Sequence, residues 1–176
     1  LTGSLFAQTI VRDDFRVNDD FSIGGSNQRT PAIAMDHEGN FVVVWLDERN
    51  TGMDIYGQRF DRLGNPLGDN FKVTESRGEG KKRFVDNIGL AMDAEGDFVV
   101  VWQEYRDRDL DIYGQRYDSN GSPIGSNFKV NDNLDRTFRF GPAVAMTPSG
   151  EFVVVWTDNR ERSFFIYGQR YSPLGE

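Results

Sequence analysis

The chain has 176 residues, 38% of them hydrophobic, which is enough for one folded domain with a sizeable core. It carries 20 Lys and Arg against 28 Asp and Glu, and a net charge of -8 argues against nucleic acid or anionic membrane as a partner. There is no cysteine and a single histidine, His37, which excludes disulfides, thiolate metal sites and most histidine-based catalytic triads. No apolar run is long enough for membrane insertion.

The first residues allow two interpretations. Residues 1–8 look like the end of a secretory signal, with apolar and small residues and Ala7 before Gln8. Residues 5–10 also align loosely with Ile55–Phe60, so they are equally a degenerate strand. Both interpretations suit an exported protein, and we therefore predict a secreted, extracellular or cell-surface location.

The rest of the chain is dominated by internal repetition. The block Phe41–Trp45 (FVVVW) returns at residues 98–102 and 152–156, and the block Ile55–Arg59 (IYGQR) returns at 112–116 and 166–170. A period of about 55 residues is typical of solenoids and propellers.

Each repeat predicts four short strands joined by tight turns. In the first unit these strands are Ala32–Asp36, Phe41–Asp47, Asp54–Asp61 and Asn70–Thr74. The turn between the first two strands always has a glycine where a tight hairpin needs a positive φ. The second strand is apolar throughout most of its length, as expected for a strand covered on both faces. No segment has helical periodicity.

These features predict an all-β, β-propeller-like fold with three four-stranded antiparallel blade units and complementary open ends. The units also resemble the tandem FVVVW…DIYGQRYD repeats of secreted bacterial proteins, which look like propeller-type blades. That resemblance covers residues 31–171 and implies a repeat architecture without implying an activity. The predicted divisions are an N-terminal segment 1–18, blade unit 1 at 19–75, blade unit 2 at 76–132 and blade unit 3 at 133–176.

The two ends of the repeat region are expected to be complementary. The third unit stops in the turn after its third strand, whereas a fourth-strand sequence near the N-terminus has no blade before it. Because an open sheet edge favours strand addition, we expect this segment to close its own third blade or to complete a neighbour's. The donor strand is Asp14, Phe15, Arg16, Val17 and Asn18, and the acceptor edge is Phe165, Ile166, Tyr167, Gln169 and Tyr171.

An acidic residue and an arginine recur between the second and third strands of each unit. These groups are Asp47 and Arg49, Glu104 and Arg106, and Asp158 and Arg160. The favoured interpretation is a set of ion pairs that fix the loops, because a catalytic site needs one asymmetric constellation. The alternative is a ligand rim with three equivalent sugar-binding sites. The three tryptophans of the FVVVW blocks are expected in the core.

Two further groups of charged residues are open to a structural or a functional interpretation. Acidic residues at the tight turns offer oxygen ligands for calcium, namely Asp36, Glu38, Asp93, Glu95 and Asp97, but no calcium-loop spacing appears, so we expect no cofactor and keep calcium only as an open candidate. The basic segments 80–84 and 136–140 are either solvated loops or subunit contacts.

Taken together, the sequence predicts a non-enzymatic extracellular structural protein with no catalytic residues. Its expected partner is itself, through strand complementation into a ring or filament. The alternative is a multivalent, lectin-like propeller module that binds glycans.

Overall fold

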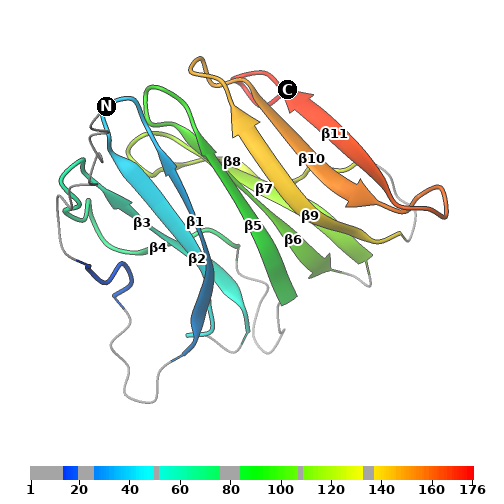
Figure 1. The fold of residues 1–176 in the computed structure, drawn as a ribbon, viewed down its shortest axis with the longest axis horizontal. Coiled ribbons are helices and arrows are strands. Elements are labelled where there is room, and N and C mark those ends of the chain that lie inside the picture. Colours follow the sequence, from blue (N-terminus) through cyan, green and yellow to red (C-terminus); the bar gives the residue numbers. More distant parts are fainter. Residues whose placement is uncertain (1–13, 20–25, 50–51, 76–83, 107–108, 133–136) are drawn as a thin grey trace, which may run out of the picture.

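The computed structural model describes residues 14–19, 26–49, 52–75, 84–106, 109–132 and 137–176. This part of the chain forms three antiparallel sheets that follow one another along the molecule (Figure 1). The all-β prediction is confirmed. Within the described residues, no helix is long and apolar enough to cross a membrane.

The strands follow the sequence order within each sheet. Sheet 1 consists of β1 (Gln28–Met35), β2 (Phe41–Asp47), β3 (Asp54–Phe60) and β4 (Phe71–Lys72). Sheet 2 consists of β5 (Phe84–Met92), β6 (Phe98–Arg106), β7 (Asp109–Tyr117) and β8 (Pro123–Lys129). Sheet 3 consists of β9 (Arg139–Met146), β10 (Phe152–Asp158) and β11 (Phe165–Tyr171).

The first strands of the three sheets lie side by side, β1 against β5 and β5 against β9. Each contains a register shift next to a residue with positive φ: Thr30 at 56°, Asn87 at 49° and Gly141 at 63°. These β-bulges explain why β1 begins at Gln28 and not at the predicted Ala32, since the strand continues on the far side of the bulge.

The hairpin turns match the sequence prediction. Gly39, Gly96 and Gly150 have φ values of 89°, 92° and 85°, which glycine adopts without a steric penalty. Asp36 Oδ1 accepts hydrogen bonds from the backbone N–H groups of Glu38 and Asn40, at 2.8 and 2.9 Å. The acidic residue thus closes its own turn.

We name the two faces of each sheet by the order of the sheets along the chain. The front face is the one turned toward the preceding sheet in sheets 2 and 3, and the rear face is the one turned toward the following sheet in sheets 1 and 2. The equivalent residues define the front face of sheet 1 and the rear face of sheet 3. Two hydrophobic clusters fill the spaces between sheets 1 and 2 and between sheets 2 and 3. Both faces of β2 and β6 are therefore buried, but the same apolar pattern in β10 is buried only on the front face. Trp45, Trp102 and Trp156 are buried, as predicted.

The segment of residues 14–19 lies against sheet 1. The ring of Phe15 contacts Phe60 with 5.6 Å between centroids. The same kind of contact joins neighbouring sheets elsewhere, between Phe71 and Tyr117 at 5.3 Å and between Phe128 and Tyr171 at 5.7 Å. In the described part of this chain, the predicted acceptor strand β11 pairs with β10 alone, at the other end of the molecule from residues 14–19 (Figure 1).

Candidate functional site

The three acid–arginine groups of the predicted rim form one repeated cluster. In sheet 1, Trp45 Nε1 donates to Asp47 Oδ2 at 3.0 Å, and Arg49 Nη2 pairs with the same oxygen at 2.8 Å. The Arg49 guanidinium lies 4.2 Å from the centroid of Tyr56. The equivalent clusters are Trp102, Glu104, Arg106 and Tyr113 in sheet 2, and Trp156, Asp158, Arg160 and Tyr167 in sheet 3.

The acids of these clusters are fully buried and already paired. Burial of Asp47 opposes its ionisation, but hydrogen bonds from Arg49 and Trp45 outweigh that effect and keep the pKa of this carboxyl below its usual value. The pKa of Asp158 is lowered in the same way, with burial opposed by Arg160 and Trp156. Because each of these carboxylates already pairs with an arginine of its own sheet, the clusters fix the loops and leave no unpaired carboxylate for catalysis.

Arg139 occupies a place that the sequence analysis did not anticipate. It was assigned to a loop that is solvated or touches another subunit, yet its side chain is fully buried between sheets 2 and 3. Arg139 Nη1 binds Asp111 Oδ1 at 2.6 Å, and Nε binds Asp158 Oδ2 at 3.1 Å. This arginine therefore joins the two sheets.

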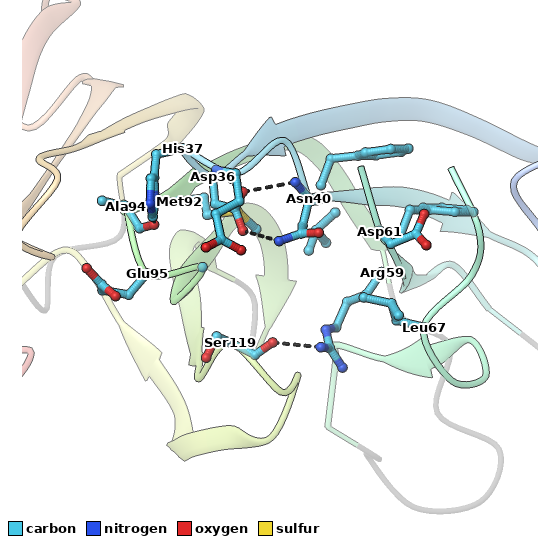
Figure 2. A pocket seen from close by; sticks show the side chains of 15 residues that line it. Asp36, His37, Asn40, Arg59, Asp61, Leu67, Met92, Ala94, Glu95 and Ser119 are labelled. Carbon is cyan, nitrogen blue, oxygen red and sulfur yellow. Dashed lines mark hydrogen bonds between the residues drawn. The ribbon is translucent and has the colours of Figure 1, made fainter. Parts of the chain in front are cut away.

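A pocket of about 300 Å³ lies between the hairpin ends of sheets 1 and 2. We call it the hairpin pocket (Figure 2). The turn between β1 and β2 lines one side and the turn between β5 and β6 lines the other. Its polar lining includes Asp36, His37, Glu38, Arg59, Asp61 and Glu95, and its apolar lining includes Phe41, Phe60, Leu67 and Met92.

The four carboxylates of the hairpin pocket fall into two classes. Asp36 and Asp61 are engaged by their own turns, since each accepts hydrogen bonds from the asparagine four residues later. Glu38 and Glu95 are exposed and accept no hydrogen bond from the part of the chain that the structure describes. These two side chains are the ones available to a ligand.

His37 bridges the two turns. Its Nδ1 contacts the backbone oxygen of Ala94 across the gap between sheets 1 and 2 (Figure 2). That carbonyl, together with the carboxylates of Glu38, Glu95 and Asp36, raises the pKa of His37 above its usual value. The protonated imidazole is thus favoured in this position.

Arg59 forms another wall of the pocket. Its guanidinium donates to the backbone oxygens of Ser119, at 2.7 Å, and Asn120 in the turn between β7 and β8 (Figure 2). Arg116 makes the same contact with Pro173 and Leu174 of sheet 3. This repeated contact holds neighbouring sheets together and shapes the pockets between them.

The corresponding pocket between sheets 2 and 3 is chemically different. It is lined by Asp93, Asp97, Arg116 and Ser149, and its volume is about 140 Å³. Ser149 stands where the other two turns have glutamate, and Ala94 stands where the first turn has His37. The sequence analysis considered Glu38 and Glu95 only as turn residues or calcium ligands. The sequence does contain a signal for this pair, because both glutamates occupy the third position of the repeated turn. That position indicates a shared pocket only once adjacent sheets are known to stack.

No metal site is evident in the described ranges, where no three acidic or histidine side chains converge in a way that would hold a metal ion. Among the acids considered for calcium, Asp93 closes its turn as Asp36 does, with its Oδ1 accepting from Glu95 N and Asp97 N at 2.9 Å each. The expectation of no cofactor, with calcium as an open candidate, stays a prediction from the sequence.

No protein-family model matches this chain, and no curated protein matches it. Solved structures do. A family 117 glycoside hydrolase from the marine bacterium Zobellia galactanivorans is 12% identical, with a TM-score of 0.53 over 92% of this chain and 58% of that protein. An α-L-arabinanase from Penicillium chrysogenum, complexed with arabinobiose, is 13% identical, with a TM-score of 0.52 over 76% of this chain and 42% of that protein. A GH43 endo-arabinanase from Bacillus licheniformis is 16% identical, with a TM-score of 0.50 over 85% of this chain and 56% of that protein.

These matches correct the functional expectation from the sequence. The chain was expected to be non-enzymatic and to act by self-assembly through strand complementation, whereas the solved proteins that share its fold are glycoside hydrolases. The chain spans about half the length of these proteins. At this level of identity the likeness shows the fold: the chain has a β-propeller-like architecture of the kind that carbohydrate-active enzymes use.

Proposed function

We propose that this chain is a carbohydrate-active propeller module that binds a glycan in the hairpin pocket and cleaves it there. The observation that carries the proposal is the pair Glu38 and Glu95, which reach one pocket from the same position of two neighbouring turns. The fold of known glycoside hydrolases supports the substrate class.

We also infer that the three sheets are successive blades of a propeller. The adjacent first strands β1, β5 and β9 are then the inner strands, and the outer strands β4 and β8 are the peripheral ones. The repeated contacts of Arg59 and Arg116 with the next sheet support this assignment, because they place each sheet in the same relation to its successor.

The pocket has the mixture of surfaces that sugars need. A pyranose or furanose ring presents hydroxyl groups around its rim and C–H groups on its faces, so a sugar site combines charged or polar hydrogen-bonding groups with apolar contact surface. Glu38, Glu95 and His37 supply the hydrogen-bonding groups, and the phenylalanine rings at residues 41 and 60 supply apolar surface.

Glycoside hydrolysis needs two carboxyl groups with different tasks. One donates a proton to the glycosidic oxygen as the bond to the anomeric carbon breaks, while the other removes a proton from the water that adds to that carbon. Glu38 and Glu95 provide these two groups. Asp36 and Asp61 are unsuited to proton transfer because their oxygens hold the turns.

The test measures binding and cleavage separately. Titration calorimetry with arabino-oligosaccharides and neutral oligosaccharides of other sugars measures binding, and release of reducing ends from arabinan and other polysaccharides measures cleavage. We expect Glu38→Gln and Glu95→Gln each to lower the cleavage rate by about 100-fold or more, as loss of a general acid or base does.

Asp69→Asn is the matched control, because it also converts an exposed carboxylate to an amide but lies outside the pocket lining. It should leave both binding and cleavage unchanged. An absence of binding and cleavage across the panel, or cleavage that survives both glutamate substitutions, would refute the proposal.

A further inference from the structure

The pocket between sheets 2 and 3 repeats the hairpin pocket with altered chemistry, and we call it the second pocket. Each residue that lines it occupies the repeat position of a residue that lines the hairpin pocket. Apolar surface is kept, since Phe98 corresponds to Phe41. Ser149 takes the place of Glu95, so the second pocket lacks the pair of glutamates on which the proposed cleavage depends.

The two pockets lie on either side of one turn, at residues 93–97 between β5 and β6. Three residues of this turn line the hairpin pocket, and its two aspartates line the second pocket. The backbone of Ala94 joins the turn to both of its neighbours. Its N–H donates to the oxygen of Pro148 at 3.3 Å, and its own oxygen contacts His37. The three turns therefore form one continuous row, along which the pockets repeat from sheet to sheet.

A carboxylate oxygen in the second pocket lacks the partner that its counterpart has. In the hairpin pocket, Asn40 Nδ2 donates to Asp36 Oδ2 at 2.8 Å. The second pocket has Asp97 in the place of this asparagine, and a carboxylate has no N–H to donate. Asp93 Oδ2 accepts no hydrogen bond from the part of the chain that the structure describes, although Asp93 is only 8% exposed. Because a buried carboxylate oxygen needs a donor, this pocket suits a ligand that supplies one.

The unpartnered oxygen lies at the pocket wall. A Cβ on Gly150, which lines the second pocket, would be 3.2 Å from Asp93 Oδ2. Asp97 adds another acceptor, since its Oδ1 accepts from Ser119 N at 2.8 Å but its Oδ2 accepts nothing from the described residues. Hydroxyl groups of a sugar donate to such oxygens, while the C–H groups of its ring contact apolar surface.

The charges of the second pocket select against anionic sugars. Its one cationic side chain, Arg116, is engaged by the backbone oxygens of Pro173 and Leu174. The two aspartates are therefore left to meet the ligand, and they repel a carboxylate on it. A neutral sugar residue fits this pocket, and a uronic acid does not.

We propose that the second pocket is a subsite that binds, without cleaving, the same glycan chain that enters the hairpin pocket. This inference rests on the proposed function, from which it takes the ligand class. Sheets that pack face to face lie about 10 Å apart, which is close to the length of a disaccharide unit. A chain that runs along the row of turns thus places one sugar residue in the hairpin pocket and the next but one in the second pocket. The ligand is a linear neutral glycan of three or more residues.

Asp97→Asn tests the role of the unpartnered oxygen, because it restores the arrangement of the hairpin pocket. There Asn40 Oδ1 accepts from Arg62 N at 3.2 Å while its Nδ2 donates to the aspartate. An asparagine at position 97 can likewise keep the contact with Ser119 N and donate to Asp93. Urea unfolding should show a variant at least as stable as the unaltered chain, so a loss of binding would not reflect misfolding.

Titration calorimetry with arabino-oligosaccharides and other neutral oligosaccharides, from the disaccharide to the hexasaccharide, measures the subsite. All proteins carry Glu38→Gln, so that the sugars are not consumed. We expect the hexasaccharide of the series that binds to bind at least about 10-fold more tightly than the disaccharide, and Asp97→Asn to remove that gain, as loss of a hydrogen bond to a charged group does. Asp69→Asn lines neither pocket and should keep the gain.

Equal affinity for the disaccharide and the hexasaccharide, or a gain that survives Asp97→Asn, would overturn the second subsite. A gain that requires added calcium would also overturn it, because a metal ion would then replace the direct contact between hydroxyl and carboxylate. Asp97 does not line the hairpin pocket, so the two proposals can fail independently. Cleavage that survives Glu38→Gln and Glu95→Gln refutes the proposed function even where the gain with chain length is present.

Discussion

Sheets 2 and 3 carry nearly the same strand sequences but differ in what covers their rear faces. β6 and β10 both contain the FVVVW block, and β7 and β11 both contain IYGQR. On sheet 2 this rear face is fully buried against sheet 3, whereas on sheet 3 it is exposed. The comparison teaches that the repeat determines the strands and their register, while burial depends on the neighbouring sheet.

The difference extends to the outer edge of the two sheets. In sheet 2 the ring of Phe128, from β8, lies directly over Gly114 of β7, so that a Cβ on this glycine would lie 2.7 Å from Phe128 Cζ. In sheet 3, a Cβ on the equivalent Gly168 would meet, among the described residues, only Val155 and Val154 of β10 within 4 Å. Identical residues therefore experience different packing, and substituting them in pairs measures how much the neighbouring elements contribute.

The largest expected difference is between the two isoleucines. Ile112→Ala should lower the free energy of unfolding by about 2–5 kcal/mol, because it removes buried methyl groups and leaves a cavity between sheets 2 and 3. Ile166→Ala should change it by no more than about 0.5 kcal/mol, because the side chain is exposed. Urea unfolding of the dilute chain gives both values.

If both isoleucine substitutions lowered the free energy of unfolding equally, the contrast between the two sheets would be wrong. The result would mean that the rear face of sheet 3 is covered within a single chain.

The two glycines give the next largest difference. Gly114→Ala should destabilise the chain by about 1–3 kcal/mol, because the added methyl group overpacks the space under the Phe128 ring. Gly168→Ala should cost at most about 1 kcal/mol: its Cβ would lie 3.2 Å from Val155 Cγ1, and alanine also reduces the entropy of the unfolded chain. Thermal and urea unfolding measure both variants, and a larger cost at Gly168 would contradict this account.

Residue patterns predict most of this fold but less of the site. The alternation in FVVVW correctly places the tryptophans in the core, and the turn glycines correctly mark the hairpins. These features depend on local chemistry, which a sequence displays directly. The bulges at Thr30, Asn87 and Gly141 are not visible in it, because their position is set by pairing between strands.

The site depends on contacts between repeats, which one repeat cannot display. Glu38 and Glu95 are 57 residues apart in sequence, the separation that also joins His37 to Ala94 across the hairpin pocket. The sequence around Arg139 predicts a basic loop, but in the structure this arginine is buried and pairs with Asp111 of sheet 2 and Asp158 of sheet 3. Only the stacking order of the sheets brings these residues together.

The smallest predicted effect concerns His37, which distinguishes the contact between sheets 1 and 2 from that between sheets 2 and 3. Folding raises the pKa of this histidine above its usual value, so the folded state binds the proton more tightly than the unfolded chain does. The stabilisation is therefore fully present below the unfolded pKa, near 6.5, and is lost as the pH rises through the folded pKa. His37→Ala removes it.

We expect the unaltered chain to lose its advantage over the His37→Ala variant as the pH is raised from about 5 to about 8. Urea midpoints of the two proteins across this range measure the effect. Because the chain has a single histidine, its imidazole signal in an NMR titration reports the pKa of His37 directly. A pKa at or below 6.5, or a stability difference that is independent of pH, would show that the contact with Ala94 does not depend on protonation and that the two sheet contacts are electrostatically alike.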